Sequence, residues 1–193
     1  MFVKDRMNKN TISVNENTTL AKTLALMKES KHKRLPVTDD GGRPVGVANR
    51  YEIEAVGTSG LVLSGTKIRD IMSARFFKVN ENTLLEDCAL VMKDNKAAFL
   101  PVVDNDNVLS GVITSFDVLK GLMRLIDISG EGCRMMVNSP DAAGIASIVG
   151  RGGNIRSIFI DDGVTVVKFY AQNASEIKDR VNSQYDVIYF VEK

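Results

Sequence analysis

The feature that most constrains this chain is an internal repeat that covers about the first two thirds of its 193 residues. The segment beginning at Val14 reads V-N-E-N-T-T-L, and the segment beginning at Val79 reads V-N-E-N-T-L-L. The spacing of 65 residues (79 − 14) holds without a gap from about Val3 to Ile53, and it aligns Leu35-Pro36-Val37 with Leu100-Pro101-Val102. So many matches in one register predict two copies of a single folding unit.

Each copy is expected to contain a strand, a helix, two further strands and a second helix. In the first copy, Leu20, Leu24 and Met27 recur at helical spacing. Asn17-Thr18 is expected to cap this helix, and the Asp- and Gly-rich segment 39–42 predicts a turn between two apolar strands. A unit of roughly 50 residues buries too little apolar surface to be stable alone. We therefore expect the two copies to pack against each other, whatever the chain does.

The pattern changes from Gly130 onward. Strands are expected at 134–137, 154–160, 164–170 and 185–191, with helices after Pro140 and from Ala174 to Val181. This order, βαββαβ, is that of a ferredoxin-like split unit. The expected fold class of the whole chain is α+β. The expected organisation is a first repeat at 1–53, a linker at 54–66, a second repeat at 67–126 and a C-terminal domain at 131–193.

Composition limits the classes of function. Twenty-five basic and 24 acidic residues give a formal net charge of +1, so we expect neither nucleic acid nor an anionic membrane as partner. No signal peptide or run of about 18 apolar residues is present, which predicts a cytoplasmic protein that spans no membrane. Cys88 and Cys133 are expected to be buried thiols. With a single histidine, His32, and no nucleophile–base pair, we expect no metal site and no catalysis.

The most informative motif is Gly111-Val-Ile-Thr114-Ser-Phe-Asp117, where a strand leads into a helix. Together with Ile71-Met72-Ser73 and Leu100-Pro101-Val102-Val103-Asp104, it resembles the CBS domain family, whose motif reads G-h-x-[T/S]-x-x-[D/N] with h apolar. The resemblance covers both repeats. It implies two βαββα-type CBS repeats packed as a Bateman module, with two clefts that commonly take AMP, ADP, ATP or S-adenosyl compounds.

The chemistry of these residues agrees with a nucleotide site. Free amides at a helix N-terminus favour phosphate. Thr114 can donate its hydroxyl to a phosphate oxygen, and Asp117 can accept bonds from both ribose hydroxyls. The ligand implied is an adenine nucleotide, AMP or ATP, and no cofactor is expected. By family position, the expected nucleotide-binding residues are Ile71, Met72, Ser73, Phe77, Ala98, Phe99, Leu100, Pro101, Gly111, Thr114 and Asp117.

A second interpretation needs no ligand, because Thr-x-x-Asp ahead of an apolar helix is close to a capping box. The two roles can also coexist. The first repeat has Asn49 and Glu52 at the equivalent positions, which keep the cap but replace the hydroxyl and lengthen the carboxylate by one methylene. We therefore expect a weaker second site in the first repeat. Its expected residues are Arg34, Asn49, Arg50 and Glu52.

Basic residues gather just before the Leu35 strand, at Lys28, Lys31, His32, Lys33 and Arg34. A solvated helix end explains such a run, since cations interact favourably with a helix C-terminus. The alternative is a phosphate clamp for a multiply charged nucleotide, with Arg34 and Arg50 as the best candidates.

The C-terminal domain resembles an ACT domain through its βαββαβ order, the run 140–149 and the segment Gly153-Asn154-Ile155. That family often binds amino acids at a dimer interface, which makes Asp141, Gly153 and Asn154 candidate ligand contacts. The alternative is a dimerisation domain without a ligand.

The CBS–CBS–ACT order, with Met1–Met7 leading straight into the first repeat, resembles the acetoin-utilisation accessory protein B family. These resemblances imply a homodimeric regulatory protein that senses an adenine nucleotide and transmits its occupancy to an unknown partner protein. The alternative is an amino-acid sensor that acts through the ACT-like domain and uses the CBS pair as a scaffold.

Overall fold

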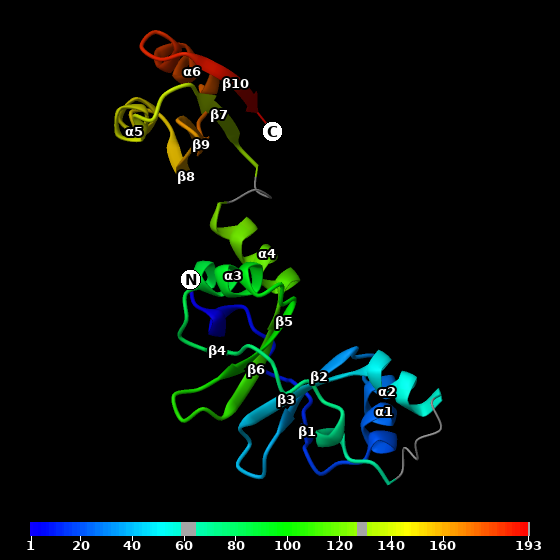
Figure 1. The fold of residues 1–193 in the computed structure, drawn as a ribbon. Helices are drawn as coiled ribbons and strands as arrows, with labels where there is room; N and C mark the ends of the chain where they lie inside the picture. Colours follow the sequence, from blue (N-terminus) through cyan, green and yellow to red (C-terminus); the bar gives the residue numbers. More distant parts are fainter. Residues whose placement is uncertain (59–64, 127–130, 193) are drawn as a thin grey trace. The chain divides into compact units, whose positions relative to one another are not determined.

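The computed structural model of the chain describes residues 1–58, 65–126 and 131–192. The chain divides into two compact units, Met1–Gly121 and Leu122–Lys193, here called the N-terminal and C-terminal units (Figure 1). Both units combine helices with sheets, so the predicted α+β class is confirmed. No helix among the described residues is long and apolar enough to cross a membrane.

The first repeat folds around a three-stranded sheet of order β1-β2-β3. The first two strands are parallel and the last two are antiparallel. The first helix starts later than predicted, because Thr19 rather than Asn17-Thr18 is its N-cap: the Thr19 side chain accepts a bond from the Lys22 amide. The elements are β1 (Val14–Asn15), α1 (Leu20–Glu29), β2 (Arg34–Thr38), β3 (Pro44–Asn49) and α2 (Arg50–Thr58).

The second repeat has the same topology, with a sheet of order β4-β5-β6. The predicted duplication of a strand–helix–strand–strand–helix unit is therefore confirmed. The elements are β4 (Val79–Asn80), α3 (Leu85–Asp94), β5 (Phe99–Val103), β6 (Leu109–Thr114) and α4 (Ser115–Leu125).

Each repeat is completed by the segment that precedes the other one. A short 3-10 turn at Val3–Asp5 lies on the second repeat, where the buried Val3 donates its amide to the Thr83 carbonyl at 2.9 Å. Asn8 then exchanges two backbone bonds with Val112 of β6, at 2.8 and 3.0 Å. The N-terminal residues therefore belong structurally to the second repeat.

The matching turn at Ile68–Asp70 lies on the first repeat. Ile68 is fully buried in the hydrophobic cluster of that repeat and donates its amide to the Thr18 carbonyl at 2.8 Å. Because the two segments are exchanged, the packed halves do not follow the sequence ranges 1–53 and 67–126. Helix α2 also runs through Thr58, so the expected linker 54–66 begins with helical residues. Residues 59–64, which belong to that expected linker, and residues 127–130 lie outside the described residues.

The C-terminal unit has a four-stranded antiparallel sheet of order β10-β7-β9-β8. This is the predicted ferredoxin-like arrangement. Its core includes Met135 and Phe169 from the sheet and Ile145 and Ile177 from the two helices. The elements are β7 (Cys133–Val137), α5 (Ala142–Gly150), β8 (Asn154–Asp161), β9 (Val164–Tyr170), α6 (Ala174–Asn182) and β10 (Val187–Glu192).

Candidate functional site

The predicted motif lies where β6 passes into α4, and its capping box is present. The Thr114 amide donates to Asp117 Oδ2 at 2.9 Å, and the Asp117 amide donates to Thr114 Oγ1 at 3.3 Å. The Thr114 hydroxyl also donates to Asp117 Oδ2, at 2.5 Å. Gly111 is needed for close approach, because a Cβ there would lie 2.7 Å from the Asn8 carbonyl oxygen. The motif thus fixes both the start of the helix and the exchanged N-terminal segment.

A pocket of about 410 Å³ opens beside this motif, and both repeats contribute to it. This volume lies within the usual range for small-molecule sites. The first repeat contributes the end of the α1–β2 connection, and the second contributes the start of β5 together with the motif. We call it the Thr114 pocket. It is lined by Asn8, Lys31, His32, Lys33, Arg34, Ala98, Phe99, Val112, Thr114 and Asp117.

The lining carries an excess of positive charge. The basic segment Lys31–Arg34 supplies two lysines and one arginine, all exposed, whereas Asp117 is the one carboxylate in the lining. Counting His32 as neutral gives a net charge of +2 (3 − 1). Within the described part of the chain, His32 Nδ1 is buried and has no hydrogen-bond partner. A concave site with this charge attracts anions.

Four predicted nucleotide-binding residues line the Thr114 pocket: Ala98, Phe99, Thr114 and Asp117. Gly111 belongs to β6 and is not in the lining. Leu100 and Pro101 are buried in β5, which leaves Phe99 as the β5 residue in the lining. Phe77 is 47% exposed and lies outside the lining.

The structure places Ile71, Met72 and Ser73 on the first repeat instead. Ser73 forms an antiparallel bridge with Val47, and a Cβ on Gly46 would lie 2.5 Å from the Met72 sulfur. These three residues therefore do not join the lining of the Thr114 pocket. The physical reason is the exchange of segments between the repeats.

Asn8 takes the position that the sequence assigned to Ser73, since the two residues are equivalent at the repeat spacing of 65 (73 − 8). Sequence reasoning missed it because it attached each segment to the repeat that follows directly. The repeat spacing could have identified Asn8, since it makes Asn8 and Ser73 equivalent candidates for this position in the pocket.

The residues expected to form a weaker second site do not all lie in one place. Asn49 caps α2 by accepting from the Tyr51 amide at 3.1 Å, and its side-chain amide donates to Glu52 Oε1 at 3.2 Å. Arg34 is the strand partner of Asn49, yet it lines the Thr114 pocket. Arg50 Nε is buried and lies 3.6 Å from Glu54, an ion pair too long for a hydrogen bond. Arg50 is thus engaged away from that pocket.

The candidate ligand contacts of the C-terminal unit lie at opposite ends of α5. Asp141 caps the helix by accepting from the Gly144 amide at 2.9 Å and from the Tyr185 hydroxyl. The bond from Tyr185, and then that from Gly144, lowers the pKa of Asp141. Gly153 and Asn154 follow the other end of this nine-residue helix, about 13 Å away at a rise of about 1.5 Å per residue. The structure does not bring the three together.

The described ranges 1–58, 65–126 and 131–192 contain no assembled set of metal ligands. No group of three or more His, Cys, Asp or Glu side chains is gathered there. Cys88 and Cys133 are free and buried, as predicted, and burial raises the pKa of Cys88 to about 11. A thiol with so high a pKa is a poor nucleophile at neutral pH.

The N-terminal unit is thus a tandem repeat of one α+β fold, with a pocket lined by residues of both copies. The sequence profile of the CBS domain matches residues 3–55 and 68–124, more than half of the chain. The chain therefore belongs to the CBS domain family.

Solved structures of CBS pairs resemble the N-terminal unit. A complex of CBSX2 with AMP is 32% identical, with a TM-score of 0.55, and the match covers 64% of this chain and 96% of that one. A CBS domain pair/ACT domain protein from Thermotoga maritima is 25% identical with a TM-score of 0.55, covering 64% and 98%. A putative acetoin utilization protein from Vibrio cholerae is 23% identical with a TM-score of 0.58, covering 66% and 94%, and this likeness shows the fold alone.

Curated relatives are matched over part of their length. Four of them, from Methanocaldococcus jannaschii and Arabidopsis thaliana, are 26–28% identical over 112–145 residues. The chain spans between 22% and 59% of the length of these relatives. One is an inosine-5'-monophosphate dehydrogenase, matched over 22% of its length.

Proposed function

We propose that this chain is a regulatory protein that binds an adenine nucleotide in the Thr114 pocket and transmits its occupancy to a partner protein. One observation carries the proposal: the motif residues Thr114 and Asp117 line the same pocket as the basic segment Lys31–Arg34. The AMP complex of CBSX2, a CBS pair 32% identical to this chain, supports the choice of ligand class.

The two ends of the pocket suit the two ends of a nucleotide. Asp117 Oδ2 is occupied by Thr114, whereas Oδ1 has no hydrogen-bond partner among the described residues, so it can accept from a ribose hydroxyl. Ala98 and Phe99 offer an apolar surface for the base. The phosphates then lie toward Lys31, Lys33 and Arg34, where cations offset their charge.

The net charge of the lining favours a polyphosphate. Three cations face one carboxylate, and ATP presents more negative charge to them than AMP does. We therefore propose that ATP binds more tightly than AMP, and that the basic segment is the phosphate clamp predicted as an alternative from the sequence. Arg50, the other residue predicted for the clamp, lies 3.6 Å from Glu54 and is not in the pocket lining, so the proposed clamp does not include it.

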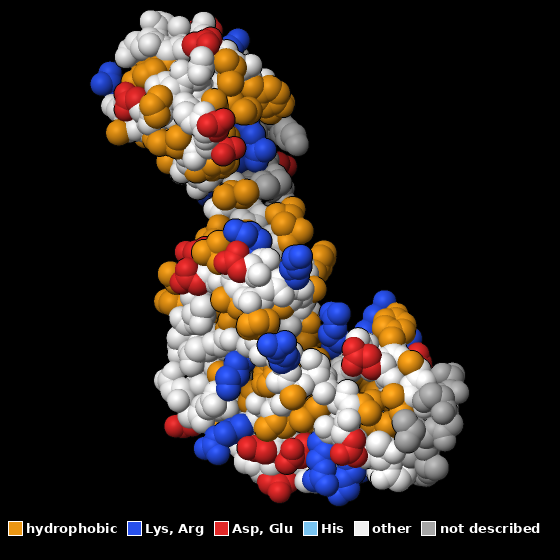
Figure 2. Space-filling view, viewed as in Figure 1, with side chains coloured by type: hydrophobic (Ala, Val, Ile, Leu, Met, Phe, Trp, Pro, Cys, Tyr) orange, Lys and Arg blue, Asp and Glu red, His pale blue; other side chains and the backbone are white. Residues whose placement is uncertain are grey.

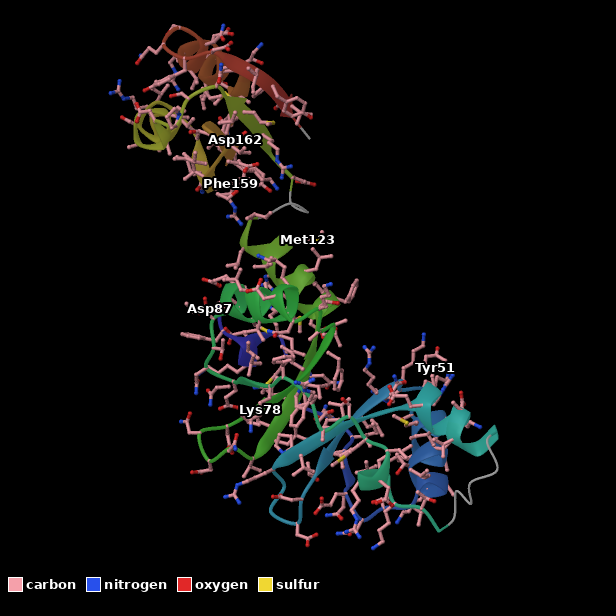
Figure 3. The ribbon with its side chains drawn as sticks, viewed as in Figure 1. Tyr51, Lys78, Asp87, Met123, Phe159 and Asp162 are labelled. Carbon is pink, nitrogen blue, oxygen red and sulfur yellow. The ribbon has the colours of Figure 1, made fainter. Side chains whose placement is uncertain are left out.

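We propose that the chain is not an enzyme and that it acts as a homodimer. Helix α4 supports an interaction surface, because Phe116, Leu119 and Met123 are 71%, 54% and 36% exposed at helical spacing. Figure 2 shows hydrophobic side chains gathered over α4, and Met123 is labelled there in Figure 3. Assignment to the acetoin-utilisation accessory protein B family, and amino-acid sensing by an ACT-like domain, stay predictions.

Isothermal calorimetry on Asp117→Ala and Glu52→Ala tests the proposed site. Asp117→Ala removes a charged acceptor of ribose bonds, and such bonds contribute about 1.5–3 kcal/mol, so affinity for AMP and ATP should fall roughly 10- to 100-fold. Glu52→Ala, which changes the equivalent capping residue of the first repeat, should leave affinity close to that of the parent. Loss of binding in Glu52→Ala together with full affinity in Asp117→Ala would overturn the proposal. Circular dichroism of both variants establishes that the helices are retained.

A further inference from the structure

A second pocket, of about 340 Å³, lies in the C-terminal unit where the end of α5 approaches the start of α6. Arg151 and Gly152, which follow directly after α5, form one side of it. We call it the α5–α6 pocket. It is lined by Arg151, Gly152, Gln172, Asn173, Glu176, Ile177 and Arg180.

The floor of the α5–α6 pocket is fixed by the hydrophobic core. The Gly153 amide donates to the Val149 carbonyl at 2.8 Å. A Cβ at Gly153 would lie 3.0 Å from the Phe169 ring and 3.2 Å from Ile177 Cδ1, so the backbone rests directly on these side chains. Ile177 is only 1% exposed. The backbone of the loop that carries Arg151 is therefore held in place by these core contacts.

Two arginines line this pocket, and neither has a carboxylate partner among the described residues. Arg180 lies across the loop, since a Cβ at Gly152 would be 3.2 Å from Arg180 Nη2. Among the described residues, the ion pairs involve Lys28, Arg50, Arg69 and Lys93, and neither Arg151 nor Arg180 takes part. Two arginines without ion-pair partners in one lining suit an oxyanion, because each guanidinium presents a planar fork of donors.

Glu176 gives the pocket a second polar end. It is one helical turn from Arg180, yet its carboxylate accepts from Asn173 Nδ2 at 3.2 Å rather than pairing with that arginine. Asn173 is the N-cap of α6 and makes no capping bond with its side chain, so the first-turn amides add a smaller attraction for anions. Two arginines and one glutamate give the lining a net charge of +1 (2 − 1).

We propose that the α5–α6 pocket binds a small metabolite that carries a phosphate or carboxylate group, held between Arg151 and Arg180. The Glu176 end suits a hydroxyl or amine donor on the same ligand. This site is separate from the Thr114 pocket and its proposal does not depend on nucleotide binding.

Nuclear magnetic resonance on the ¹⁵N-labelled full chain tests the site with inorganic phosphate and with succinate as probes. Saturable shifts are expected at the amides of Gly152, Gly153 and residues 174–176. A response to phosphate alone assigns a phosphate group to the ligand, and a response to succinate alone assigns a carboxylate. Sodium chloride at matched ionic strength serves as the blank. Equal shifts with chloride, or no saturable shift with either probe, would overturn the proposal.

Substitutions separate the site from general electrostatics. Arg151→Gln and Arg180→Gln should each weaken binding of the effective probe by about 10-fold, because each removes a charge-assisted donor pair. Lys178→Gln is the matched control: it removes the same charge from α6, but Lys178 lies over the Phe190 ring, outside the lining. Glu176→Gln should tighten binding of the bare anion, since it removes a nearby negative charge. Equal weakening in Lys178→Gln and the two arginine variants would exclude a built site.

Discussion

Thr114 illustrates how one side chain can serve both the fold and a ligand. Its hydroxyl donates to Asp117 Oδ2 in the structure, and its oxygen accepts from the Asp117 amide, so the helix start is fully capped. The capping box therefore explains the Thr-x-x-Asp spacing by itself. Thr114 also lines the pocket. In the proposed nucleotide complex, a rotation about its Cα–Cβ bond would turn the hydroxyl from Asp117 toward a phosphate oxygen.

Two substitutions at Thr114 distinguish these roles. Thr114→Ser keeps the hydroxyl, and Thr114→Asn keeps a good N-cap while copying Asn49 of the first repeat. We expect both proteins to melt close to the parent, and Thr114→Asn alone to lose nucleotide affinity, because the amide displaces the hydroxyl from the phosphate position. Melting temperatures check the cap and calorimetry with AMP and ATP checks the ligand role. Parental affinity in Thr114→Asn would leave capping as the whole account of this threonine.

Asp141 predicts an acid dependence of stability in the C-terminal unit. Its hydrogen bond from Tyr185, followed by that from the Gly144 amide, lowers its pKa below the ordinary value of 3.8. A lowered folded pKa means that the contribution is complete above the unfolded pKa and is lost as pH falls through the folded pKa. Asp141→Asn keeps a good cap but removes the charge. The variant should be less stable than the parent at neutral pH, and urea unfolding should show this difference shrinking as the pH falls below 3.8 and through the lowered folded pKa. A difference independent of pH would contradict the assignment.

At the scale of elements, the repeat predicted the topology of both halves but not the exchange between them. Val3 and Ile68 are equivalent at the spacing of 65 (68 − 3), and both are fully buried. Either apolar side chain could fill the equivalent buried position of either repeat. The sequence pattern is therefore compatible with exchanged and with unexchanged packing. Only the three-dimensional course of the chain shows which packing is adopted. It places Ile71, Met72 and Ser73 on the first repeat, away from the site for which they were predicted.

The glycines at the two exchanged contacts give a matched test. A Cβ at Gly111 would lie 2.7 Å from the Asn8 backbone oxygen. At Gly46 the nearest atom is the flexible Met72 sulfur, and the nearest backbone atom, the Ser73 oxygen, is less close at 3.1 Å. Gly111→Ala should destabilise the chain by about 1–3 kcal/mol, since backbone must move, and should weaken nucleotide binding because Asn8 lines the pocket. Gly46→Ala should cost less, since a thioether can rotate away and alanine restricts the unfolded chain. Urea unfolding and calorimetry measure both effects, and a larger cost at Gly46 would contradict this order.

At the scale of the whole molecule, the sequence predicted the kind of site more accurately than the residues that form it. Thr114, Asp117, Ala98 and Phe99 were predicted from the family motif and do line one pocket. Arg34 was assigned to the other repeat's site, because nothing in a linear pattern shows which way a strand's first side chain points. The α5–α6 pocket was not predicted at all, since its two arginines come from segments about 30 residues apart that only the ferredoxin-like fold brings together.

The division into two units predicts that nucleotide stabilises only one of them. The Thr114 pocket lies wholly within Met1–Gly121, so a nucleotide at about 100-fold its Kd should add roughly 2.7 kcal/mol to that unit. Differential scanning calorimetry of the full chain should then show two unfolding transitions. ATP should raise the midpoint temperature of one of them. Val149→Ala identifies the other, because Val149 is fully buried in the core of the C-terminal unit and its truncation lowers that transition. If ATP raises the temperatures of both transitions equally, or Val149→Ala lowers the temperature of the transition that ATP raises, the two units unfold together and the prediction is contradicted.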